Sequence, residues 1–205
     1  MSAALTVIGA GGHAKVVVGL LHASGIPVHA CFDDDASRWG SSVLGIEVRG
    51  PISAVVPGTP AVLAIGNNSA RRAQAELPMR WVTLVHPRAF VDPSVRLGPG
   101  TVVFAGAVIQ PEARLGAHVI VNTGACIDHD CVLGDCSHVA PGAHLAGAVT
   151  LGEGAFLGVG AAVIPGRTVG AWATVGAGAA VVRDVEPNTT VVGVPARPLA
   201  ARPGR

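Results

Sequence analysis

Residues 91–185 repeat one six-residue pattern without a break. Every sixth residue from Val91 to Val181 is Leu, Ile or Val, which makes sixteen consecutive hexads. The residue four places after each of these is small or β-branched in fifteen of the sixteen units, and Arg167 is the one departure. A six-residue period fits neither a helix, with its 3.6-residue repeat, nor the simple alternation of a strand. It indicates a short strand followed by a corner, many times over.

A single hexad cannot bury its aliphatic side chain alone, so the units are expected to wind and stack into a solenoid. The pattern resembles that of the hexapeptide-repeat acyltransferases. That resemblance implies a left-handed parallel β-helix with three hexads per coil, and sixteen hexads would then form about five coils. The handedness is implied by the resemblance, because the period alone does not set it.

Residues 1–85 follow a different pattern, in which apolar runs alternate with helical periodicity. The expected strands are residues 5–9, 28–32 and 61–65, with a candidate short strand pair at residues 43–48 around Gly45. The expected helices are residues 14–23 and 69–77, and residues 81–84 close the unit. Ser69 is placed to cap the second helix. Strands that alternate with helices predict a parallel sheet, and the short length predicts a Rossmann-like half domain. The domain boundary is expected at residues 86–93, where Pro87 and Pro93 interrupt regular structure.

A glycine-rich turn, Gly9-x-Gly11-x-x-Ala14, follows the first expected strand, and Asp33 and Asp34 end the second. This spacing fits a dinucleotide fingerprint and so allows an NAD site. The segment is too short for both halves of such a fold, so a single nucleotide near the helix N-terminus is favoured. The alternative is a tight turn that only packs the helix on the strand.

Residues 7–17, 32–34 and 64–68 resemble the sugar-nucleotide acetyltransferases of the pilin- and N-glycan-modification family, which is related to the sialic acid O-acetyltransferases. The resemblance implies that residues 1–85 bind a UDP- or GDP-linked amino sugar and that residues 86–205 bind acetyl-CoA. The expected sugar-nucleotide residues are Gly11, Gly12, His13, Lys15, Asp33, Asp34, Gly66, Asn67, Asn68 and Arg71. Among them, Lys15, Asn67, Asn68 and Arg71 are candidates to bind phosphate.

One polar stretch, Asp128-His129-Asp130, interrupts the apolar repeat. His129 comes two residues after the inward Ile127, so its ring is expected at the surface beside a corner. A carboxylate can fix the tautomer of a histidine and raise its basicity, as a general base requires. The resemblance implies that His129 deprotonates the attacking amine with help from Asp130, where the family often has Glu. The alternative is a surface histidine without a role.

The resemblance also implies an acetyl-CoA site with Asn122 in the pocket, His138 near the acetyl group and Gly147 beside the thioester. The tail at residues 191–197, which contains Pro195, resembles the segment that closes the CoA channel, and Arg167 and Arg197 are candidates to bind the CoA phosphates. The Gly147 N–H would contact the thioester oxygen. His129 and Gly147 are eighteen residues apart, so they are expected one coil above the other, where two groups can bracket one carbonyl carbon. The alternative for Gly147 is a corner that needs glycine.

Composition narrows the function classes. A net charge of +1 gives no support for nucleic acid or an anionic membrane as partner. No apolar run reaches the length of a membrane span, and the N-terminus lacks the basic region of a signal peptide, so a cytoplasmic protein is expected. Cys126, Cys131 and Cys136 could hold zinc with His118 or His144, but paired ligand spacing is absent, so no metal is expected.

With these observations, the resemblance implies an acetyl-CoA-dependent N-acetyltransferase that acts on the 4-amino group of a nucleotide-linked 4-amino-4,6-dideoxy sugar, with UDP as the first choice of nucleotide. The transfer is expected to be direct, without an acylated residue. The alternatives are a GDP- or dTDP-linked substrate, O-acetylation of a sugar such as sialic acid, and a β-helix that only binds.

The spacing of two histidines predicts an assembly. His129 and His138 are nine residues apart, which is half a coil, so they are expected on opposite sides of one solenoid. The resemblance nevertheless implies that both belong to one pocket. A homotrimer with active sites between subunits satisfies both conditions, because a head-to-tail contact closes into a ring.

Overall fold

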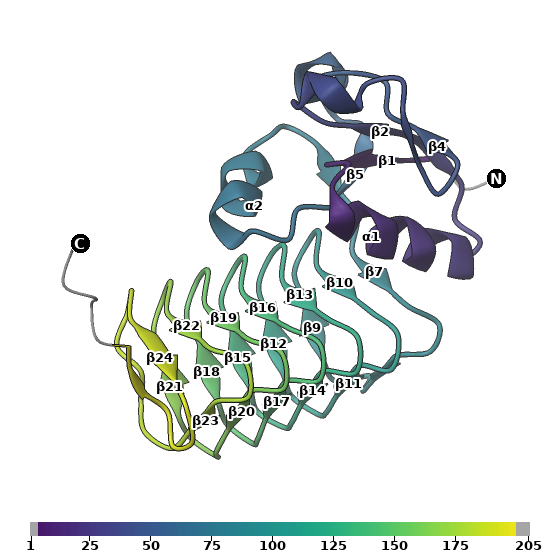
Figure 1. Ribbon diagram of the computed structural model, residues 1–205. Helices are drawn as coiled ribbons and strands as arrows, with labels where there is room; N and C mark the ends of the chain where they lie inside the picture. The colour runs from purple at the N-terminus through teal and green to yellow at the C-terminus, as the bar shows by residue number, and fades with distance from the viewer. Residues whose placement is uncertain (1–3, 200–205) are drawn as a thin grey trace, which may run out of the picture.

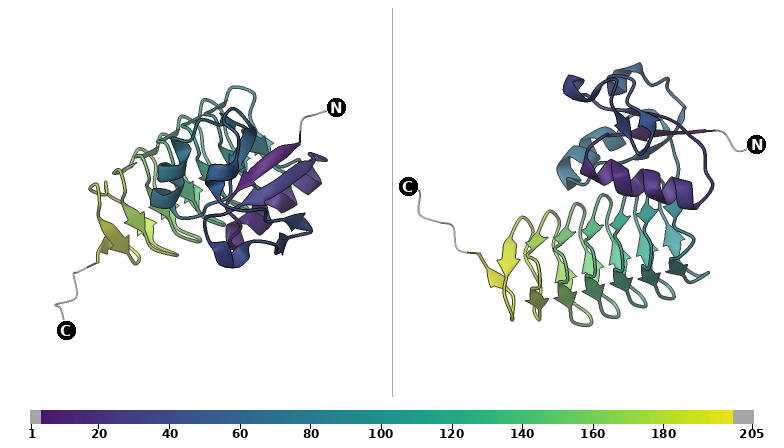
Figure 2. Two further views of the ribbon diagram at one scale, coloured as in Figure 1. Left: turned by 90° about the horizontal axis from the view of Figure 1, so that it is seen from above. Right: turned by 45° about the vertical axis from the view of Figure 1, so that its right-hand side comes forward.

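The computed structural model describes residues 4–199, which form an α/β domain seated on one side of a long solenoid (Figure 1). Residues 1–3 and 200–205, at the ends of the two predicted domains, lie outside the described part. Seen from above, the α/β domain covers the N-terminal coils and leaves the C-terminal coils free (Figure 2).

The α/β domain contains a four-stranded parallel sheet in the order β2-β1-β5-β6. Its strands are β1 (Leu5–Ile8), β2 (Val28–Phe32), β5 (Pro60–Leu63) and β6 (Arg80–Trp81). The helices are α1 (Gly12–Ala23) and α2 (Asn68–Ala75), with short 3-10 turns η1 (Ala36–Arg38) and η2 (Ile52–Ala54). A separate hairpin joins β3 (Ser42–Val43) to β4 (Ile46–Glu47). The half-domain prediction is therefore confirmed.

The predicted cap of the second helix is wrong. Asn67 has extended backbone angles directly before α2, and its side chain accepts a hydrogen bond from the Ala70 N–H at 2.9 Å. Ser69 already lies within the first turn, where its hydroxyl donates to Asn67 at 2.8 Å. An N-cap residue must lie just outside the helix, so Asn67 takes this position.

The solenoid has three faces, each a stack of short parallel strands. The first face contains β7 (Leu84–Val85), β10 (Val102–Val103), β13 (Ile120–Val121), β16 (His138–Val139), β19 (Phe156–Leu157), β22 (Thr174–Val175) and β24 (Thr190–Val192), and antiparallel β25 (Arg197–Pro198) closes it. The second face contains β8 (Phe90–Val91), β11 (Val108–Ile109), β14 (Cys126–Ile127), β17 (His144–Leu145), β20 (Ala162–Val163) and β23 (Ala180–Val181). The third face contains β9 (Arg96–Leu97), β12 (Arg114–Leu115), β15 (Val132–Leu133), β18 (Thr150–Leu151) and β21 (Thr168–Val169).

Strand register confirms eighteen residues per coil, as Val103 pairs with Val121 and Val121 with Val139. The aliphatic residues and the small residues four places later fill the interior. The predicted number of coils is too low. The first face has seven parallel rungs because winding begins at Leu84, before the first counted hexad, and continues to Val192.

One of the hydrophobic clusters contains residues of both domains. Helix α1 packs its buried face, including Val17 and Leu21, against outward residues of the first face such as Phe104 and Ile120. The first face is therefore the surface of the solenoid against which the α/β domain packs. Among residues 4–199, no helix has the length and apolar character needed to cross a membrane.

Candidate functional site

His129 occupies the corner between the second and third faces, directly after β14. Its Nδ1 lies 2.7 Å from Oδ2 of Asp130, which adopts a left-handed conformation with φ of 61°. Asp128 instead accepts a hydrogen bond from the His129 backbone N–H at 2.8 Å. The predicted choice of Asp130 as the ring's partner thus agrees with the geometry, and the shorter reach of Asp suffices.

The electrostatics of this corner favour a basic ring. The hydrogen bond to Asp130 is the main cause that raises the pKa of His129, and the negative charges of Asp128 and Asp130 add to it. Since the carboxylate accepts from Nδ1–H, the free lone pair is on Nε2. The side chain is 59 % exposed, so this nitrogen can reach a ligand.

Gly147 lies one coil further along, under the His129 ring. A Cβ on Gly147 would lie 2.6 Å from both Cε1 and Nε2 of that ring. The left-handed residue of this corner is Ala148, so Gly147 is not required by the turn. At the same corner position of the sixteen hexads, only residue 147 is Gly. Close approach of the imidazole therefore explains this glycine, and the reading of a corner that needs glycine does not.

His138 and Asn122 meet on the first face. Asn122 Oδ1 accepts from the Thr123 N–H at 2.8 Å, which directs its amide nitrogen to Nε2 of His138 at 3.1 Å. His138 then carries its hydrogen on Nδ1, which has no hydrogen-bond partner. The residue is 7 % exposed, and burial, with the charge of Arg71 second, lowers its pKa to about 3. His138 is thus a neutral ring with one unpaired polar atom.

His13 of the α/β domain lies near His138. Its ring centroid is 6.3 Å from that of His138 and 5.5 Å from that of Phe104, which it meets edge-on. Burial, with Arg71 second, lowers the pKa of His13 to about 4, and its Nε2 also lacks a partner. His13 therefore lies between the domains and beside the residues expected to hold the acetyl group.

The glycine-rich turn leaves the start of α1 open. Gly9 has φ of 102°, and a Cβ there would lie 3.0 Å from Ile65 and 3.1 Å from the Ala64 carbonyl oxygen, so only glycine fits. A Cβ on Gly11 or Gly12 would meet nothing, and Lys15 is exposed one turn further. This helix end can accept an anionic group, as predicted for the nucleotide.

The two aspartates after β2 differ in availability. Asp33 accepts from the Ala10 N–H at 2.6 Å and from the Asp35 N–H at 2.9 Å, so both its carboxylate oxygens hold the loops around it. Asp34 uses only Oδ1, which accepts from the Ile52 N–H at 2.9 Å. Asp34 is therefore the freer ligand. Arg38, which the sequence interpretation did not single out, donates to the Ala10 carbonyl at 3.1 Å and so lies over the same turn.

The prediction that Arg71 binds phosphate is wrong. The side chain is 1 % exposed, and Nε, Nη1 and Nη2 all donate to protein oxygens. Asn68 is also buried, and its amide donates to the Gly154 carbonyl at 3.0 Å. Both residues connect the α/β domain to the solenoid and are not free to bind phosphate.

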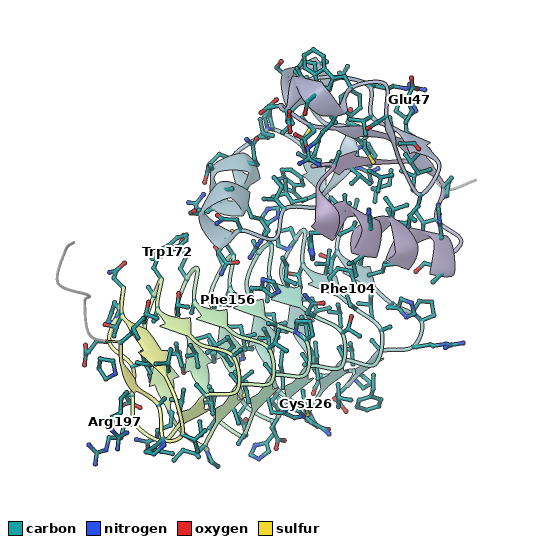
Figure 3. The ribbon with its side chains drawn as sticks, in the orientation of Figure 1. Glu47, Phe104, Cys126, Phe156, Trp172 and Arg197 are labelled. Atoms are coloured by element: carbon teal, nitrogen blue, oxygen red, sulfur yellow. The ribbon has the colours of Figure 1, made fainter. Side chains whose placement is uncertain are left out.

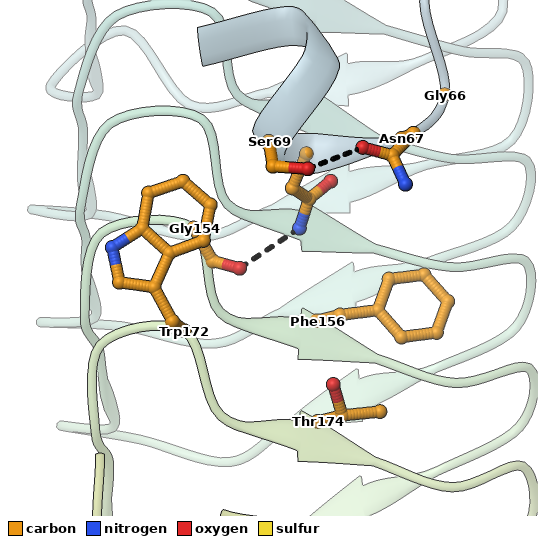
Figure 4. Close-up of a pocket in the computed structure, with 8 residues that line it drawn as sticks. Gly66, Asn67, Ser69, Gly154, Phe156, Trp172 and Thr174 are labelled. Carbon is orange, nitrogen blue, oxygen red and sulfur yellow. Dashed lines mark hydrogen bonds between the residues drawn. The ribbon is translucent and has the colours of Figure 1, made fainter. Parts of the chain in front are cut away.

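A pocket of about 420 Å³ lies between the start of α2 and the first face (Figure 4). It is lined by Gly66, Asn67, Asn68, Ser69, Gly154, Phe156, Trp172 and Thr174, all of them uncharged. Three predicted substrate residues, Gly66, Asn67 and Asn68, thus line one pocket with two aromatic side chains that sequence reasoning missed. The available signal was Trp172, which holds a left-handed corner position with φ of 60° that bulky residues avoid.

The remaining acetyl-CoA candidates lie toward the C-terminal end of the solenoid, where Figure 3 labels Arg197. Arg167 lies 3.6 Å from Asp184, and Arg197 lines a second pocket of about 360 Å³ with Arg183. Pro195 lies two residues before β25. The structure therefore does not gather all the predicted acetyl-CoA residues at one place within a single chain.

The two histidines point in opposite directions. His138 belongs to the first face, whereas His129 is at the corner between the second and third faces. In a three-sided solenoid that corner is opposite the first face. The half-coil separation predicted from the sequence is thus present.

Within residues 4–199, no group of three His, Cys, Asp or Glu side chains is placed to hold a metal ion. The four cysteines are unpaired, and Cys131 and Cys136 are buried. Burial raises the pKa of both thiols, which disfavours the thiolate that zinc requires.

Comparison with known proteins agrees with this architecture. Residues 4–77 match the family described as the PglD N-terminal domain. A UDP-N-acetylbacillosamine N-acetyltransferase of Bacillus subtilis is 42 % identical over 113 residues, which are 49 % of this chain and 51 % of that protein. The aligned part therefore spans about half the length of this curated relative.

Two solved structures cover the whole architecture. PerB from Caulobacter crescentus, in complex with CoA and GDP-perosamine, is 42 % identical with a TM-score of 0.88, and the match covers 97 % of this chain and 98 % of that one. The acetyltransferase domain of PglB from Neisseria gonorrhoeae, in complex with acetyl coenzyme A, is 42 % identical with a TM-score of 0.87, covering 95 % and 98 %.

Proposed function

This chain belongs to the hexapeptide-repeat family of sugar-nucleotide N-acetyltransferases, and from that premise we propose that it acetylates the 4-amino group of a nucleotide-linked 4-amino-4,6-dideoxy sugar. Acetyl-CoA is the proposed donor, because the similar PerB and PglB structures contain CoA and acetyl coenzyme A. The observation that carries the catalytic proposal is the His129–Asp130 pair lying over Gly147. A β-helix that only binds would not need it.

His129 Nε2 is the proposed general base. It takes a proton from the sugar amine as the amine nitrogen forms a bond to the thioester carbon. Asp130 stabilises the imidazolium that results, and the C–S bond then breaks to release CoA, which leaves as the thiol once it has a proton. No residue becomes acylated.

The Gly147 N–H is the proposed donor to the carbonyl oxygen as negative charge develops on it. Within the described part of the chain, this N–H donates no hydrogen bond. The corner position is also one where other hexads carry Pro, as at Pro111 and Pro165, so its amide is not needed for the fold. A free, fixed amide of this kind stabilises an oxyanion without rearrangement.

We propose UDP as the nucleotide, because the similar Bacillus subtilis protein is named for a UDP-linked sugar. GDP is the alternative, because PerB was solved with GDP-perosamine. A thermal-shift series with UDP-, GDP- and dTDP-linked amino sugars at equal concentration separates these readings, since the ligand that binds most tightly stabilises the protein most. Larger stabilisation by a GDP-linked sugar would reverse the order.

The active assembly is proposed to be a homotrimer with the site between subunits. His129 and His138 of one chain face opposite ways, so one pocket can contain both only if two chains contribute. Chains that carry His129→Ala can be mixed with chains that carry His138→Ala after dissociation. Mixed trimers should recover part of the activity, whereas a fully active monomer in sedimentation would contradict the assembly.

The direct test is an acetyl-transfer assay with each amino sugar and acetyl-CoA, followed by thiol release and product mass. His129→Ala should lower kcat by about 10²–10⁴ while the fold persists. Turnover close to wild type would remove His129 from the mechanism. Acetylation of a sugar hydroxyl, with no activity on amines, would favour the O-acetyltransferase alternative.

A further inference from the structure

Arg71 is a buried cation without a carboxylate partner. Its guanidinium donates to the carbonyls of Ile65 at 2.9 Å and Gly66 at 3.2 Å and to Oδ1 of Asn68 at 2.8 Å, all in the α/β domain. None of the ion pairs formed by residues 4–199 includes it. Burial lowers its pKa to about 10, so it remains charged at neutral pH.

The same guanidinium donates into two successive coils of the solenoid. Nε donates to the His118 carbonyl at 2.9 Å, and Nη2 donates to the carbonyls of Cys136 at 2.7 Å and Ser137 at 3.3 Å. His118 and Cys136 are eighteen residues apart and are both left-handed corner residues, with φ of 55° and 53°. Arg71 is therefore hydrogen-bonded to two stacked corners of the solenoid at once.

We propose that Arg71 is a positioning residue that fixes the 65–68 loop against the first face of the solenoid and so sets where the sugar nucleotide lies relative to the acetyl-transfer site. This inference rests on the function proposed above. Burying an ion is costly unless it is fully hydrogen-bonded, and only the guanidinium of Arg has enough N–H donors to meet this many acceptors. The loop cannot move relative to the corners without leaving a charge or a carbonyl unpaired.

The loop held by Arg71 contributes directly to the predicted site. Gly66 and Asn67 line the interdomain pocket. A Cβ on Gly66 would lie 3.6 Å from Cβ of His13, whose ring in turn lies beside that of His138. A displaced loop would thus change both the pocket wall and the packing of the two buried histidines.

Arg72 provides a matched control in the same helix. It also crosses between the domains, with Nε 2.9 Å from Oε1 of Glu153, and it pairs with Glu76 on its own helix. Its side chain is 40 % exposed, and exposed ion pairs contribute only about 0–1 kcal/mol. If the loss of any interdomain contact impaired the enzyme, substitution of either arginine would do so. If the buried guanidinium positions the loop, only substitution of Arg71 impairs the enzyme.

The test compares Arg71→Lys, Asn68→Ala and Arg72→Lys in the full chain, well below each variant's melting temperature. Lys keeps the charge but cannot reach all six acceptors. Arg71→Lys should raise KM for the sugar nucleotide about tenfold or more and leave KM for acetyl-CoA within about twofold, and Asn68→Ala should change the same constant. Arg72→Lys should match wild type. Unchanged KM values with kcat reduced only by the unfolded fraction would overturn the inference.

Hydrogen exchange supplies a readout that does not depend on activity. In Arg71→Lys, amides of residues 66–70 should exchange at least about tenfold faster, while those of the distant coils β20 to β23 should not change. If the wild type acetylates no amino sugar, the proposed function fails while this measurement still tests the loop. Uniform exchange changes across the chain, or none at residues 66–70, would contradict the positioning role. If Arg71→Lys does not fold, Asn68→Ala tests the positioning role by the same two measurements, which are KM for the sugar nucleotide and hydrogen exchange at residues 66–70.

Discussion

Replacing Gly147 with alanine should impair the proposed base without harming the fold. The new Cβ would lie 2.6 Å from Cε1 and Nε2 of His129, whereas ordinary contacts are about 3.5–4.0 Å, so the ring must move by about 1 Å. A displacement of this size costs about 10²-fold in rate. The same corner position carries alanine at Ala105, Ala117 and Ala171, so the backbone accepts the change. Unfolding free energy should change by less than about 1 kcal/mol, because the exposed ring can swing away.

The assay is acetyl transfer at saturating acetyl-CoA, with thermal melting in parallel. The control is the double-mutant cycle with His129→Ala. Without the ring, Gly147→Ala should lower activity by less than about twofold further, because the contact that displaced the base no longer exists. Wild-type kcat in Gly147→Ala would refute the reasoning. So would an equal loss in both backgrounds, which would show that the methyl group obstructs the substrate itself.

Three further outcomes are expected. Asp130→Asn should move the acidic limb of the kcat–pH profile to lower pH, because the carboxylate raises the pKa of His129 and the base is active only when neutral; an unmoved limb would contradict the pairing. His13, His118 and His138 have pKa values lowered to about 4, 4 and 3, so between pH 6.5 and 4 the unfolded chain binds protons that the native chain does not. Urea denaturation should show the free energy of unfolding falling as the pH is lowered through that window, and a flat profile would contradict their burial. Asp34→Ala should raise KM for the sugar nucleotide and leave KM for acetyl-CoA unchanged, whereas loss of NADH binding would favour a dinucleotide site.

Most of the fold was predictable because its signals are local. Val28–Phe32 was predicted to the residue, since an apolar run there ends in three aspartates. The first strand of the solenoid was also visible, because Val85 lies six residues before Val91. Pro87 led to its assignment outside the repeat. The cap of α2 was not decided locally, because Asn67 and Ser69 are both good caps and the choice depends on where the loop is held.

The candidate site was predictable only where sequence neighbours form it. His129 and Asp130 are adjacent, so their pairing followed from the chain itself. Arg71 was expected to bind phosphate because the sequence shows no internal partner for its charge. Its acceptors are mainly backbone carbonyls, which every residue has, so the sequence does not reveal them. Trp172 was overlooked since its importance comes from facing a loop more than a hundred residues earlier in the chain.

Because one coil contains eighteen residues, the sequence separation of two residues determines on which sides of the solenoid they lie. This limits which residues of one chain can meet in one site. Eighteen residues place Gly147 under His129, which the close approach of the ring confirms. Nine residues place His138 on the opposite side, where the α/β domain of the same chain covers it. One chain therefore presents the proposed base on one side and the buried His138 on the other. The proposed chemistry requires a second copy to bring them together, so the repeat that builds the fold also predicts the assembly.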